Sequence, residues 1–593
     1  MARNKKAQIK EYSPSKYQVA IFDYIANGKG NLVVEAAAGS GKSYTLVKSL
    51  ELIPQDKSVL MVAFNRDIVK ELQKKVKGFD NVSVKTIHSL GLHMMKNNFG
   101  FDCGIPEMFK YDSFIKDNIS ELSSLNVRRL GRNTFVKYIG NIKRYVDFGR
   151  YYLCENVDDL SFIEERYNIE TLFDEKEIAL KVMDWGKDIH DVVDYTDMIW
   201  IPNKLNLSSD GLSFDYIMAD ECQDINKAER MLILKCLKDD SRLICVGDTN
   251  QCIYTFAGSD PDSFKELKNL PNTISMPLSI SYRCADNIVK FAQKFVPSIE
   301  KNNDGRLGEV KSGVQLEDVN DGDMVICRNN APLLYAYTRF LGMGKKCYIR
   351  GKDIGSNLKM IVKSYGKDEL NVDCKKDGLF ARLFEDLFNT RNKIMTKFGV
   401  DGKTALTSPI IESKMDTIFA LEILSEGINT SDELIAKIDD IFPKKDEKEG
   451  IALSTIHKAK GLEAGNVFVI CNSLMPSKNA KKEWEVLQEK NLMYVAYTRA
   501  KNKLFFVSED EFDKFNTNSQ SYIDGLERIE KVVNMTIGRW TIEDLDEEKA
   551  SSIIKRATKI ENKHINMPTL GKSNVIAKPR GFASMLKKKK RLK

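Results

Sequence analysis

Short runs of apolar and β-branched residues alternate with segments of helical periodicity in two separate parts of the chain. Such runs predict buried strands, and strands that alternate with helices predict a parallel sheet covered by helices. The strands expected in the first part are residues 31–35, 58–64, 82–86, 214–220 and 242–247. Those expected in the second part are residues 323–327, 451–456, 467–471 and 504–507. Helices are expected at residues 66–76, 330–341 and 484–499. The predicted fold class is therefore α/β, with two parallel-sheet domains.

Each of these two parts is interrupted by a long segment whose pattern is helical. We expect a first α/β domain made of residues 1–91 and 207–275, and a second made of residues 276–354 and 450–509. Largely helical insertions occupy residues 92–206 and 355–449. A helical C-terminal extension, residues 510–565, precedes a flexible basic tail, residues 566–593. A length of 593 residues is too great for one core, which agrees with several domains.

The positive charge of the chain is concentrated at its C-terminal end. Lys and Arg number 91 against 84 Asp and Glu, but residues 572–593 hold nine basic and no acidic residues. Without that segment the chain has 82 basic and 84 acidic residues and is nearly neutral. We therefore expect a polyanion to bind at a local site and not over the whole surface. Two interpretations of the tail remain open: a solubilising end, or an arm that docks on nucleic acid or on a protein partner.

The cysteines and the N-terminus point to an intracellular protein. None of the eleven cysteines, such as Cys222, Cys236, Cys245 and Cys252, has the C-x2-C spacing of a zinc or redox site, and we expect them to be reduced and buried. Residues 1–18 lack the apolar core of a signal peptide, and no apolar run approaches the roughly 20 residues that span a bilayer. We expect a cytoplasmic or nucleoid-associated protein, of cellular or viral origin, with no membrane partner.

A phosphate-binding loop follows the first predicted strand. Residues 36–43 read Ala-Ala-Ala-Gly-Ser-Gly-Lys-Ser and lead into a helical pattern. Small residues allow backbone N–H groups to surround phosphates, Lys42 neutralises phosphate oxygens, and Ser43 can ligate Mg²⁺. The alternative is an ordinary Gly-rich turn. The residues predicted to bind the nucleotide here are Ala38, Gly39, Ser40, Gly41, Lys42, Ser43 and Tyr44.

Two adjacent carboxylates, Asp220 and Glu221, end the strand predicted at residues 214–220. In nucleotide hydrolysis such a pair divides the work: Asp220 would hold Mg²⁺ and Glu221 would orient or deprotonate the attacking water. An acidic pair at a strand end can also be a helix cap or a solvated turn. Its combination with the loop at Lys42 favours an ATP site.

Further segments extend this pair of sites into an ordered series of motifs. In chain order they are SPSKYQ (13–18), VAFN (62–65), TIHS (86–89), VGDTNQCIYTFAG (246–258), SYR (281–283), STIHKAKGLE (454–463) and LMYVAYTRA (492–500). With them the chain resembles the UvrD/Rep/PcrA group of superfamily-1 DNA helicases from about residue 12 to 507. The resemblance implies that the two α/β domains are RecA-like motor domains. Ala257 departs from the family, which usually has Arg there, and Asn65 follows Phe64 where the family has Thr-Asn.

The resemblance implies roles at the nucleotide for residues far from the loop. Gln18 would bond to the adenine, on which Tyr282 would lie, and Gln251 would sense the γ-phosphate. Arg283 and Arg499 would reach that phosphate from the second domain. Gly461 and Glu463 would also contact the nucleotide. The cofactors implied are ATP and Mg²⁺, with Lys42, Glu221, Gln251, Arg283 and Arg499 as the catalytic set.

The resemblance also implies a path for single-stranded DNA. The residues it assigns to DNA are Phe64, Asn65, Thr86, His88, Tyr254, Phe256, Thr455 and His457. Aromatic side chains there would stack on bases without reading sequence. The alternatives are that the aromatics belong to the core and that both histidines are structural.

The implied function is an ATP-dependent DNA helicase that moves on single-stranded DNA from 3′ to 5′ and displaces the complementary strand at single-strand/duplex junctions. Replication, repair and recombination are all compatible with it. Two alternatives remain open: a translocase acting on RNA or on both nucleic acids, and an ATP-gated binding factor or switch without processive unwinding.

Overall fold

A computed structural model describes residues 13–515 except 64–65, 101, 304, 366–367, 371–377, 401, 403–404, 406–407 and 443–448. Two predicted DNA contacts, Phe64 and Asn65, therefore lie outside the described residues, as do the basic tail and nearly all of the C-terminal extension. None of the described helices is both long and apolar enough to cross a membrane.

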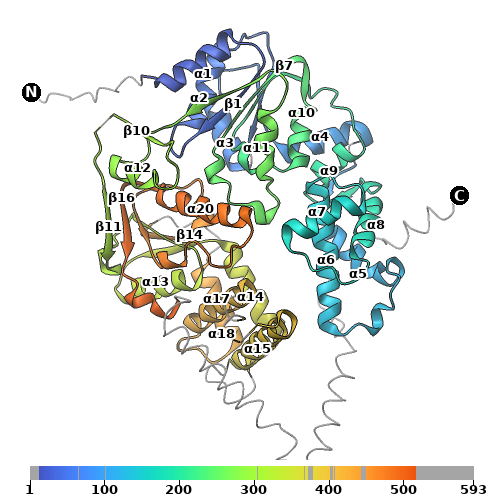
Figure 1. Ribbon diagram of the computed structural model, residues 1–593, viewed down its shortest axis with the longest axis vertical. Helices are drawn as coiled ribbons and strands as arrows, with labels where there is room; N and C mark the ends of the chain where they lie inside the picture. Colours follow the sequence, from blue (N-terminus) through green and yellow to red (C-terminus); the bar gives the residue numbers. More distant parts are fainter. Residues whose placement is uncertain are drawn as a thin grey trace, which may run out of the picture. The chain divides into compact units, whose positions relative to one another are not determined.

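The first domain is built on a six-stranded sheet whose strands all pair in parallel (Figure 1). In spatial order the strands are β3 (Val82–Thr86), β2 (Val59–Ala63), β6 (Phe214–Ala219), β7 (Leu237–Gly247), β1 (Asn31–Ala36) and β8 (Thr273–Leu278). The helices that follow or precede them include α1 (Lys16–Asn27), α2 (Lys42–Ser49), α3 (Arg66–Lys75), α10 (Lys227–Leu234) and α11 (Pro261–Lys268). The predicted parallel α/β fold is confirmed for this domain.

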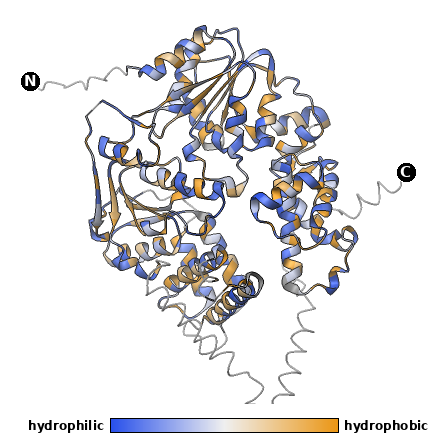
Figure 2. Cartoon of the chain, in the orientation of Figure 1, coloured by the Kyte–Doolittle hydropathy of each residue, from blue (hydrophilic) through white to orange (hydrophobic). Residues whose placement is uncertain are grey.

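Side chains of the central strands alternate between two cores, one on each face of this sheet. Val33 and Leu60 pack on one face, whereas Leu32 and Val59, their neighbours in sequence, pack on the other. This alternation follows from the two-residue repeat of a strand. All five residues of β2 are buried, which explains why it has no polar positions. Figure 2 shows apolar residues along the strands.

The second domain also has a six-stranded parallel sheet. In spatial order its strands are β11 (Glu309–Val314), β16 (Ala500–Val507), β15 (Ala464–Val469), β12 (Met324–Cys327), β14 (Ile451–Thr455) and β13 (Cys347–Arg350). Its helices include α12 (Asp286–Ala292), α13 (Ala331–Gly342), α19 (Ile456–Ala459) and α20 (Glu483–Tyr497). The second parallel-sheet domain is thereby confirmed as well.

Three edge strands were not predicted from the sequence: β8, β11 and β13. Strand β8 contains Pro277, and a proline, which cannot donate a ladder hydrogen bond, is tolerated at a sheet edge. It pairs with β1 as far as Leu278, three residues past the expected domain boundary at residue 275. Strand β11 is mostly polar and β13 has four residues, so neither gives a strong apolar pattern.

The segment between β3 and β6, called insertion 1 (residues 92–206), has its own apolar core. It contains the greater part of α4 (Ile87–Phe99), and α5 (Lys110–Leu122), α6 (Arg132–Tyr151), α7 (Val157–Tyr167), α8 (Glu175–Lys187) and α9 (Asp197–Lys204), with a short parallel pair of β4 (Ile105–Pro106) and β5 (Val192–Val193). A buried charge cluster joins its helices: Asp197 lies 2.6 Å from Lys110 and 3.0 Å from Arg150. Removing one partner of such a cluster costs about 3–5 kcal/mol, so it fixes how the helices pack.

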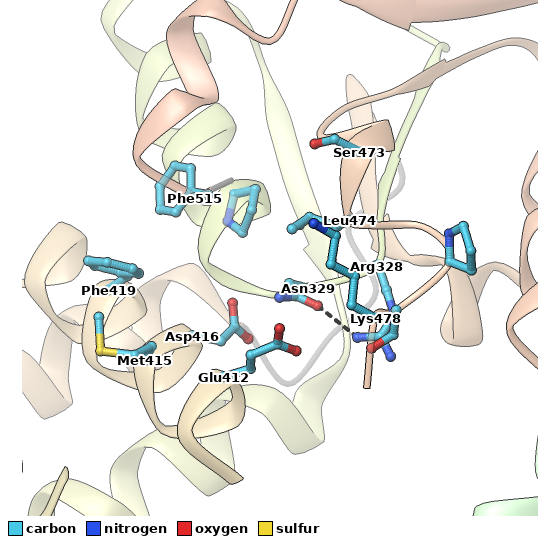
Figure 3. A pocket seen from close by; sticks show the side chains of 13 residues that line it. Arg328, Asn329, Glu412, Met415, Asp416, Phe419, Ser473, Leu474, Lys478 and Phe515 are labelled. Atoms are coloured by element: carbon cyan, nitrogen blue, oxygen red, sulfur yellow. Dashed lines mark hydrogen bonds between the residues drawn. The ribbon is translucent and has the colours of Figure 1, made fainter. Parts of the chain in front are cut away.

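The segment between β13 and β14, called insertion 2 (residues 355–449), is helical where it is described. Its helices are α14 (Lys352–Tyr365), α15 (Leu379–Phe398), α17 (Pro409–Leu424) and α18 (Ser431–Ile441). Asp416 on α17 accepts hydrogen bonds from the backbone N–H groups of Asn330 and Ala331 at the start of α13. A small pocket lies beside this contact, lined also by Arg328, Glu412 and Phe419 (Figure 3). The half-buried carboxylate of Asp416 therefore caps α13, which is a structural use.

Candidate functional site

The phosphate loop connects β1 to α2, at the carboxyl end of its strand. Gly39 and Gly41 have φ of 72° and 85°, a left-handed conformation that favours glycine. The second domain approaches the loop closely: a Cβ on Gly39 would lie 2.4 Å from the Cβ of Arg283, and the Tyr282 N–H donates to the Gly39 carbonyl at 2.8 Å. The loop conformation and the closeness of the second domain therefore both require glycine at position 39.

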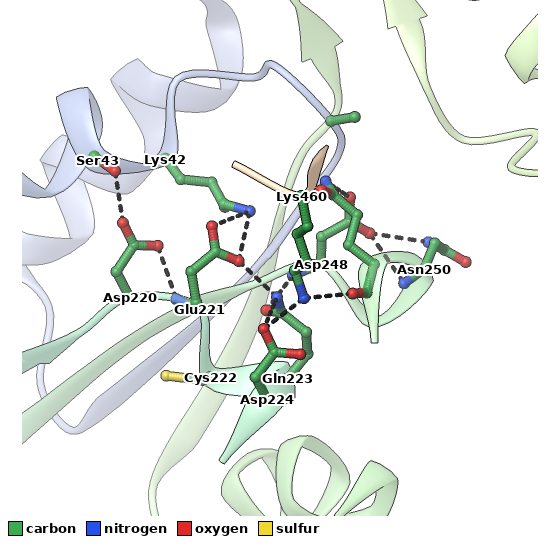
Figure 4. Close-up of polar contacts among 12 residues, drawn as sticks. Lys42, Ser43, Asp220, Glu221, Cys222, Gln223, Asp224, Asp248, Asn250 and Lys460 are labelled. Atoms are coloured by element: carbon green, nitrogen blue, oxygen red, sulfur yellow. Dashed lines mark hydrogen bonds and ion pairs between the residues drawn. The ribbon is translucent and has the colours of Figure 1, made fainter. Parts of the chain in front are cut away.

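The two carboxylates predicted to divide the work of hydrolysis have different partners (Figure 4). Ser43 Oγ donates to Asp220 Oδ2 at 2.6 Å, whereas Lys42 Nζ lies 3.1 and 3.2 Å from the two oxygens of Glu221. Glu221 has a φ of 55°, a strained backbone of the kind that gathers at active sites. The structure thus brings these four residues together, while the roles predicted for them remain predictions.

Burial and the surrounding charges shift the pKa values of Asp220 and Glu221 in opposite directions. Burial and the adjacent Glu221 charge raise the pKa of Asp220. Burial would raise the pKa of Glu221 too, but the positive charges of Lys42 and Lys460 outweigh it and lower that pKa to about 2. With the Ser43 hydroxyl, which donates to it, Asp220 forms the oxygen-rich ligand pair that Mg²⁺ prefers. These two residues fit the metal role predicted for them.

A hydrogen-bond network extends from this centre to the coupling segment 246–258. Gln251 Nε2 donates to Asp248 Oδ2 at 2.6 Å, and Gln251 Oε1 accepts from Arg499 Nη2 at 3.2 Å. Lys460 of the second domain donates to Asp224 Oδ2 and to the Gln251 carbonyl. Burial raises the pKa of Asp224 to about 6, even with Lys460 beside it. Gln251 therefore connects the two domains at the nucleotide site.

Both predicted arginines face this centre from the second domain. Arg283 Nε donates to Glu463 Oε2 at 2.7 Å, and Arg499, which is buried, donates from Nε to the Val495 carbonyl at 2.8 Å. Burial and the nearby charge of Arg283 lower the pKa of Arg499 to about 9. Two cations held close together at a cavity wall suit a polyanion such as a triphosphate.

One cavity of about 980 Å³ collects most of the predicted nucleotide residues from both domains. Of the predicted set its lining includes Gly39, Ser40, Gly41, Lys42, Ser43, Tyr44, Asp220, Glu221, Gln251, Tyr282, Arg283, Gly461, Glu463 and Arg499. Ser40 Oγ is buried there without a hydrogen-bond partner in the described part of the chain, as expected of a loop shaped for a ligand. The cavity has the residues and the charge of a nucleoside triphosphate site.

Two family models match the chain, and each matched range contains residues that line this cavity. The UvrD/REP helicase N-terminal domain matches residues 19–272, and the UvrD-like helicase C-terminal domain matches residues 416–511. The chain belongs to the UvrD/Rep family of helicases. The resemblance inferred from the ordered motifs is confirmed.

Individual relatives share a low identity with this UvrD/Rep-family protein over most of its length. It is 23% identical to a probable DNA helicase II homolog of Mycoplasma genitalium, over 86% of this chain and 88% of the relative. It is also 23% identical to the ATP-dependent DNA helicase PcrA of Bacillus subtilis, over 83% of each chain. The F-box DNA helicase protein 1 of Schizosaccharomyces pombe is 25% identical over 80% of this chain and 55% of the relative.

Two predicted nucleotide residues of this UvrD/Rep-family protein do not line the cavity. Gln18 is buried behind the loop, where Nε2 donates to Thr45 Oγ1 at 3.1 Å and Oε1 accepts from the Ser15 N–H at 3.0 Å. The Ala38 N–H donates to the hydroxyl of Tyr494 at 2.9 Å. Gln18 thus holds the start of α2 to α1, and the Ala38 backbone holds the loop to α20, while the roles predicted for both residues at the nucleotide remain predictions.

Four predicted DNA contacts lie together where the domains meet. The Tyr254 hydroxyl donates to the His457 carbonyl at 2.9 Å, and the ring of Phe256 meets the His457 ring edge-on at 5.6 Å. Thr455 caps α19 by accepting from the Lys458 N–H. Phe256 is 51% exposed and so leaves a ring face available for a base.

The other two described DNA candidates, Thr86 and His88, lie in the first domain at the start of α4. Thr86 Oγ1 accepts from the Ser89 N–H and caps that helix. The ring of His88 lies edge-on to Tyr195, with 6.0 Å between ring centres. Tyr195 is 48% exposed and was not singled out from the sequence, although an exposed aromatic beside a predicted DNA residue is a candidate contact.

His457 should make the protein less stable in acid. Burial and the charge of Arg328 lower its pKa to about 4, whereas an unfolded histidine titrates near pH 6.5. Between those values the unfolded chain takes up a proton that the folded chain does not, so this contribution is complete above about pH 6.5 and is lost as the pH falls toward 4. We expect His457→Gln to lose less stability than the wild type between pH 7 and 4.5 in urea denaturation. Equal losses would contradict the assignment.

Proposed function

We propose that this protein is an ATP- and Mg²⁺-dependent DNA helicase that translocates on single-stranded DNA from 3′ to 5′ and displaces the complementary strand at single-strand/duplex junctions. ATP-dependent DNA helicase activity follows from membership of the UvrD/Rep family. The direction of travel and the preference for junctions are the proposal's own steps.

The observation that carries the proposal is the short segment from Gln251 to Phe256. Gln251 lines the nucleotide cavity and contacts Arg499, and five residues later Phe256 presents a half-exposed ring beside His457. A change in the shape of the nucleotide cavity at Gln251 is therefore only five residues away from a ring on which a base can stack. Arginines that enter the site from a second domain make hydrolysis depend on domain closure, which turns ATP turnover into domain motion.

The chemistry can be assigned to this chain's own side chains. Lys42 and the two arginines neutralise charge on the transferring phosphoryl group, and Glu221, ionised through Lys42 and Lys460, orients or deprotonates water. Ser43 and Asp220 would hold Mg²⁺, which supplies further charge neutralisation on the phosphates. Opening one base-pair step of the duplex costs about 1.4 kcal/mol on average, which is small beside the free energy of hydrolysing one ATP.

The direct test is strand displacement on duplexes with a 3′ tail, a 5′ tail or no tail, with ATP and Mg²⁺ and with Lys42→Ala as the inactive control. Unwinding of the 3′-tailed duplex alone is the expected result. Opening of only the 5′-tailed duplex would overturn the direction. If no duplex opens while DNA still stimulates ATP hydrolysis, the protein is a translocase or a switch, and comparing DNA with RNA as stimulant identifies its track.

Phe256→Ala should reduce unwinding far more than basal ATP hydrolysis. A lost stacking platform removes about 1–3 kcal/mol per base, which corresponds to roughly 5- to 150-fold in DNA affinity or stepping. Basal hydrolysis should stay within about twofold, because Phe256 does not line the nucleotide cavity. Parallel strand-displacement and DNA-free ATPase assays check this. Equal loss in both assays would contradict a role in coupling.

The basic tail, which lies outside the described residues, is proposed to be a nucleic-acid arm. Each phosphate it neutralises on a single strand should add about 0.7 to the slope of log K against log salt. Deletion of residues 572–593 should therefore flatten that slope in DNA-binding titrations. An unchanged slope would leave the tail as a solubilising end or a protein-docking segment.

A further inference from the structure

The N-terminal end of α20, in the second domain, contacts the C-terminal end of α7, in insertion 1. Trp484 Nε1 donates to the Arg166 carbonyl at 3.2 Å. Lys482 Nζ donates to the same carbonyl at 3.3 Å and also to the Glu165 carbonyl. The last carbonyls of a helix have no partner within it and carry partial negative charge. A lysine and an indole N–H from another domain therefore cap α7.

The same end of α7 also contacts the coupling segment. The Tyr167 hydroxyl donates to the Thr255 carbonyl at 3.2 Å, and Arg166 Nη1 lies 3.5 Å from Asp262 of α11, which follows that segment. The Tyr167 ring centre is 6.0 Å from that of Trp484. Gln488 of α20 accepts from the Phe256 N–H at 3.4 Å. Insertion 1, the coupling segment and α20 thus meet beside Phe256.

The rest of α20 contacts the nucleotide site. Asn491 Nδ2 donates to the carbonyls of Thr249 and Cys252, and the Tyr494 hydroxyl accepts from the Ala38 N–H of the phosphate loop. Arg499, two residues past the helix end, donates to Gln251. A helix of 15 residues is about 22 Å long and moves as a rigid rod. A displacement of the arginine end therefore shifts or tilts the whole helix, including the end that carries Trp484.

We propose that Lys482 and Trp484 form a latch that ties insertion 1 to the nucleotide state. When the cleft around the phosphates opens or closes, α20 moves, the capping contact with α7 breaks or forms, and insertion 1 is released or held beside Phe256. Trp484 is a positioning residue in this scheme, because it touches neither the nucleotide cavity nor the reacting atoms. The proposal rests on the motor function proposed above.

Three substitutions on α20 test the latch in the full chain. Trp484→Ala removes the indole donor and the ring contact, Trp484→Phe removes only the donor, and Leu487→Ala alters a side chain that is 50% exposed on the same helix. For Trp484→Ala we expect base pairs opened per ATP to fall about three- to tenfold, the effect of one lost hydrogen bond with its packing, with DNA-stimulated kcat within about twofold. The number of base pairs that Trp484→Phe opens per ATP should lie between those of the wild type and Trp484→Ala. Leu487→Ala should match the wild type. Unchanged coupling in Trp484→Ala, or an equal fall of ATPase and unwinding, would overturn the latch.

A fluorescence measurement separates failure of the latch from failure of the helicase proposal. The chain has four tryptophans, so subtracting the emission of Trp484→Phe from that of the wild type isolates Trp484. We expect the difference spectrum to shift between the protein with ADP and with a non-hydrolysable ATP analogue, as the indole exchanges the Arg166 carbonyl for water. A spectrum that ignores the nucleotide would overturn the latch even in an active helicase. A shift in a protein that opens no duplex would support the latch and contradict the helicase proposal.

Discussion

Lys42→Ala should reduce ATP hydrolysis by at least about 10³-fold, because it removes both a phosphate-binding cation and the partner that keeps Glu221 ionised. The ammonium lies 3.1 Å from the nearer Glu221 oxygen, and its charge is the largest of those that lower the pKa of this half-buried acid. Without it, burial should raise that pKa and weaken Glu221 as the residue that activates water. DNA-stimulated ATPase at saturating ATP measures the loss.

Lys48→Ala is the matched control for this substitution. Lys48 lies on the same helix, α2, but its side chain is 46% exposed and pairs with Glu51 at the surface. Exposed pairs of this kind contribute at most about 1 kcal/mol, so this variant should keep wild-type ATPase activity. Thermal unfolding of both variants shows whether they remain folded. If Lys42→Ala keeps a tenth or more of the wild-type rate, the assignment of the phosphate loop is wrong.

The sequence predicted the central strands of both sheets because these strands are buried on both faces and therefore read as short apolar runs. Strand β2, with five buried residues, is the clearest case. Edge strands such as β11 and β13 need fewer apolar residues, so their patterns do not differ from those of loops. The missed strands are thus the ones whose formation depends on a neighbouring strand more than on their own composition.

The same distinction applies to the nucleotide site. Lys42, Ser43, Asp220 and Glu221 follow strands of one parallel sheet, so their convergence could be predicted from motif and strand order alone. The contacts of Lys460 with Asp224 and of Tyr494 with Ala38 join residues more than 200 positions apart in different domains. They depend on how two domains dock, which no local pattern specifies. Gln18 shows a third case, since the Ser15-x-x-Gln18 spacing is also that of a helix capping box, and the structure forms one.

Arg499→Ala should lower the rate of ATP hydrolysis by about 10³- to 10⁵-fold while changing ATP affinity far less, because an arginine of this kind acts on charge that develops in the transition state. The side chain is buried and oriented by the Val495 and Leu462 carbonyls, and its remaining donors face Gln251 and the cavity. Arg499→Lys should restore little, since a lysine lacks the planar fork that makes several of these bonds at once. Single-turnover hydrolysis and nucleotide binding, measured separately, distinguish the two effects.

Arg339→Ala is a suitable control for this second substitution, because Arg339 lies in the same domain with its side chain 43% exposed and paired with Glu511. It should leave both measurements unchanged. If Arg499→Ala weakens ATP binding by the same factor as hydrolysis, the guanidinium contributes to binding in general, and closure of the cleft would not be the step that licenses chemistry. A selective loss of hydrolysis, in contrast, places the catalytic switch at the end of α20, the helix whose other end holds insertion 1 through Trp484.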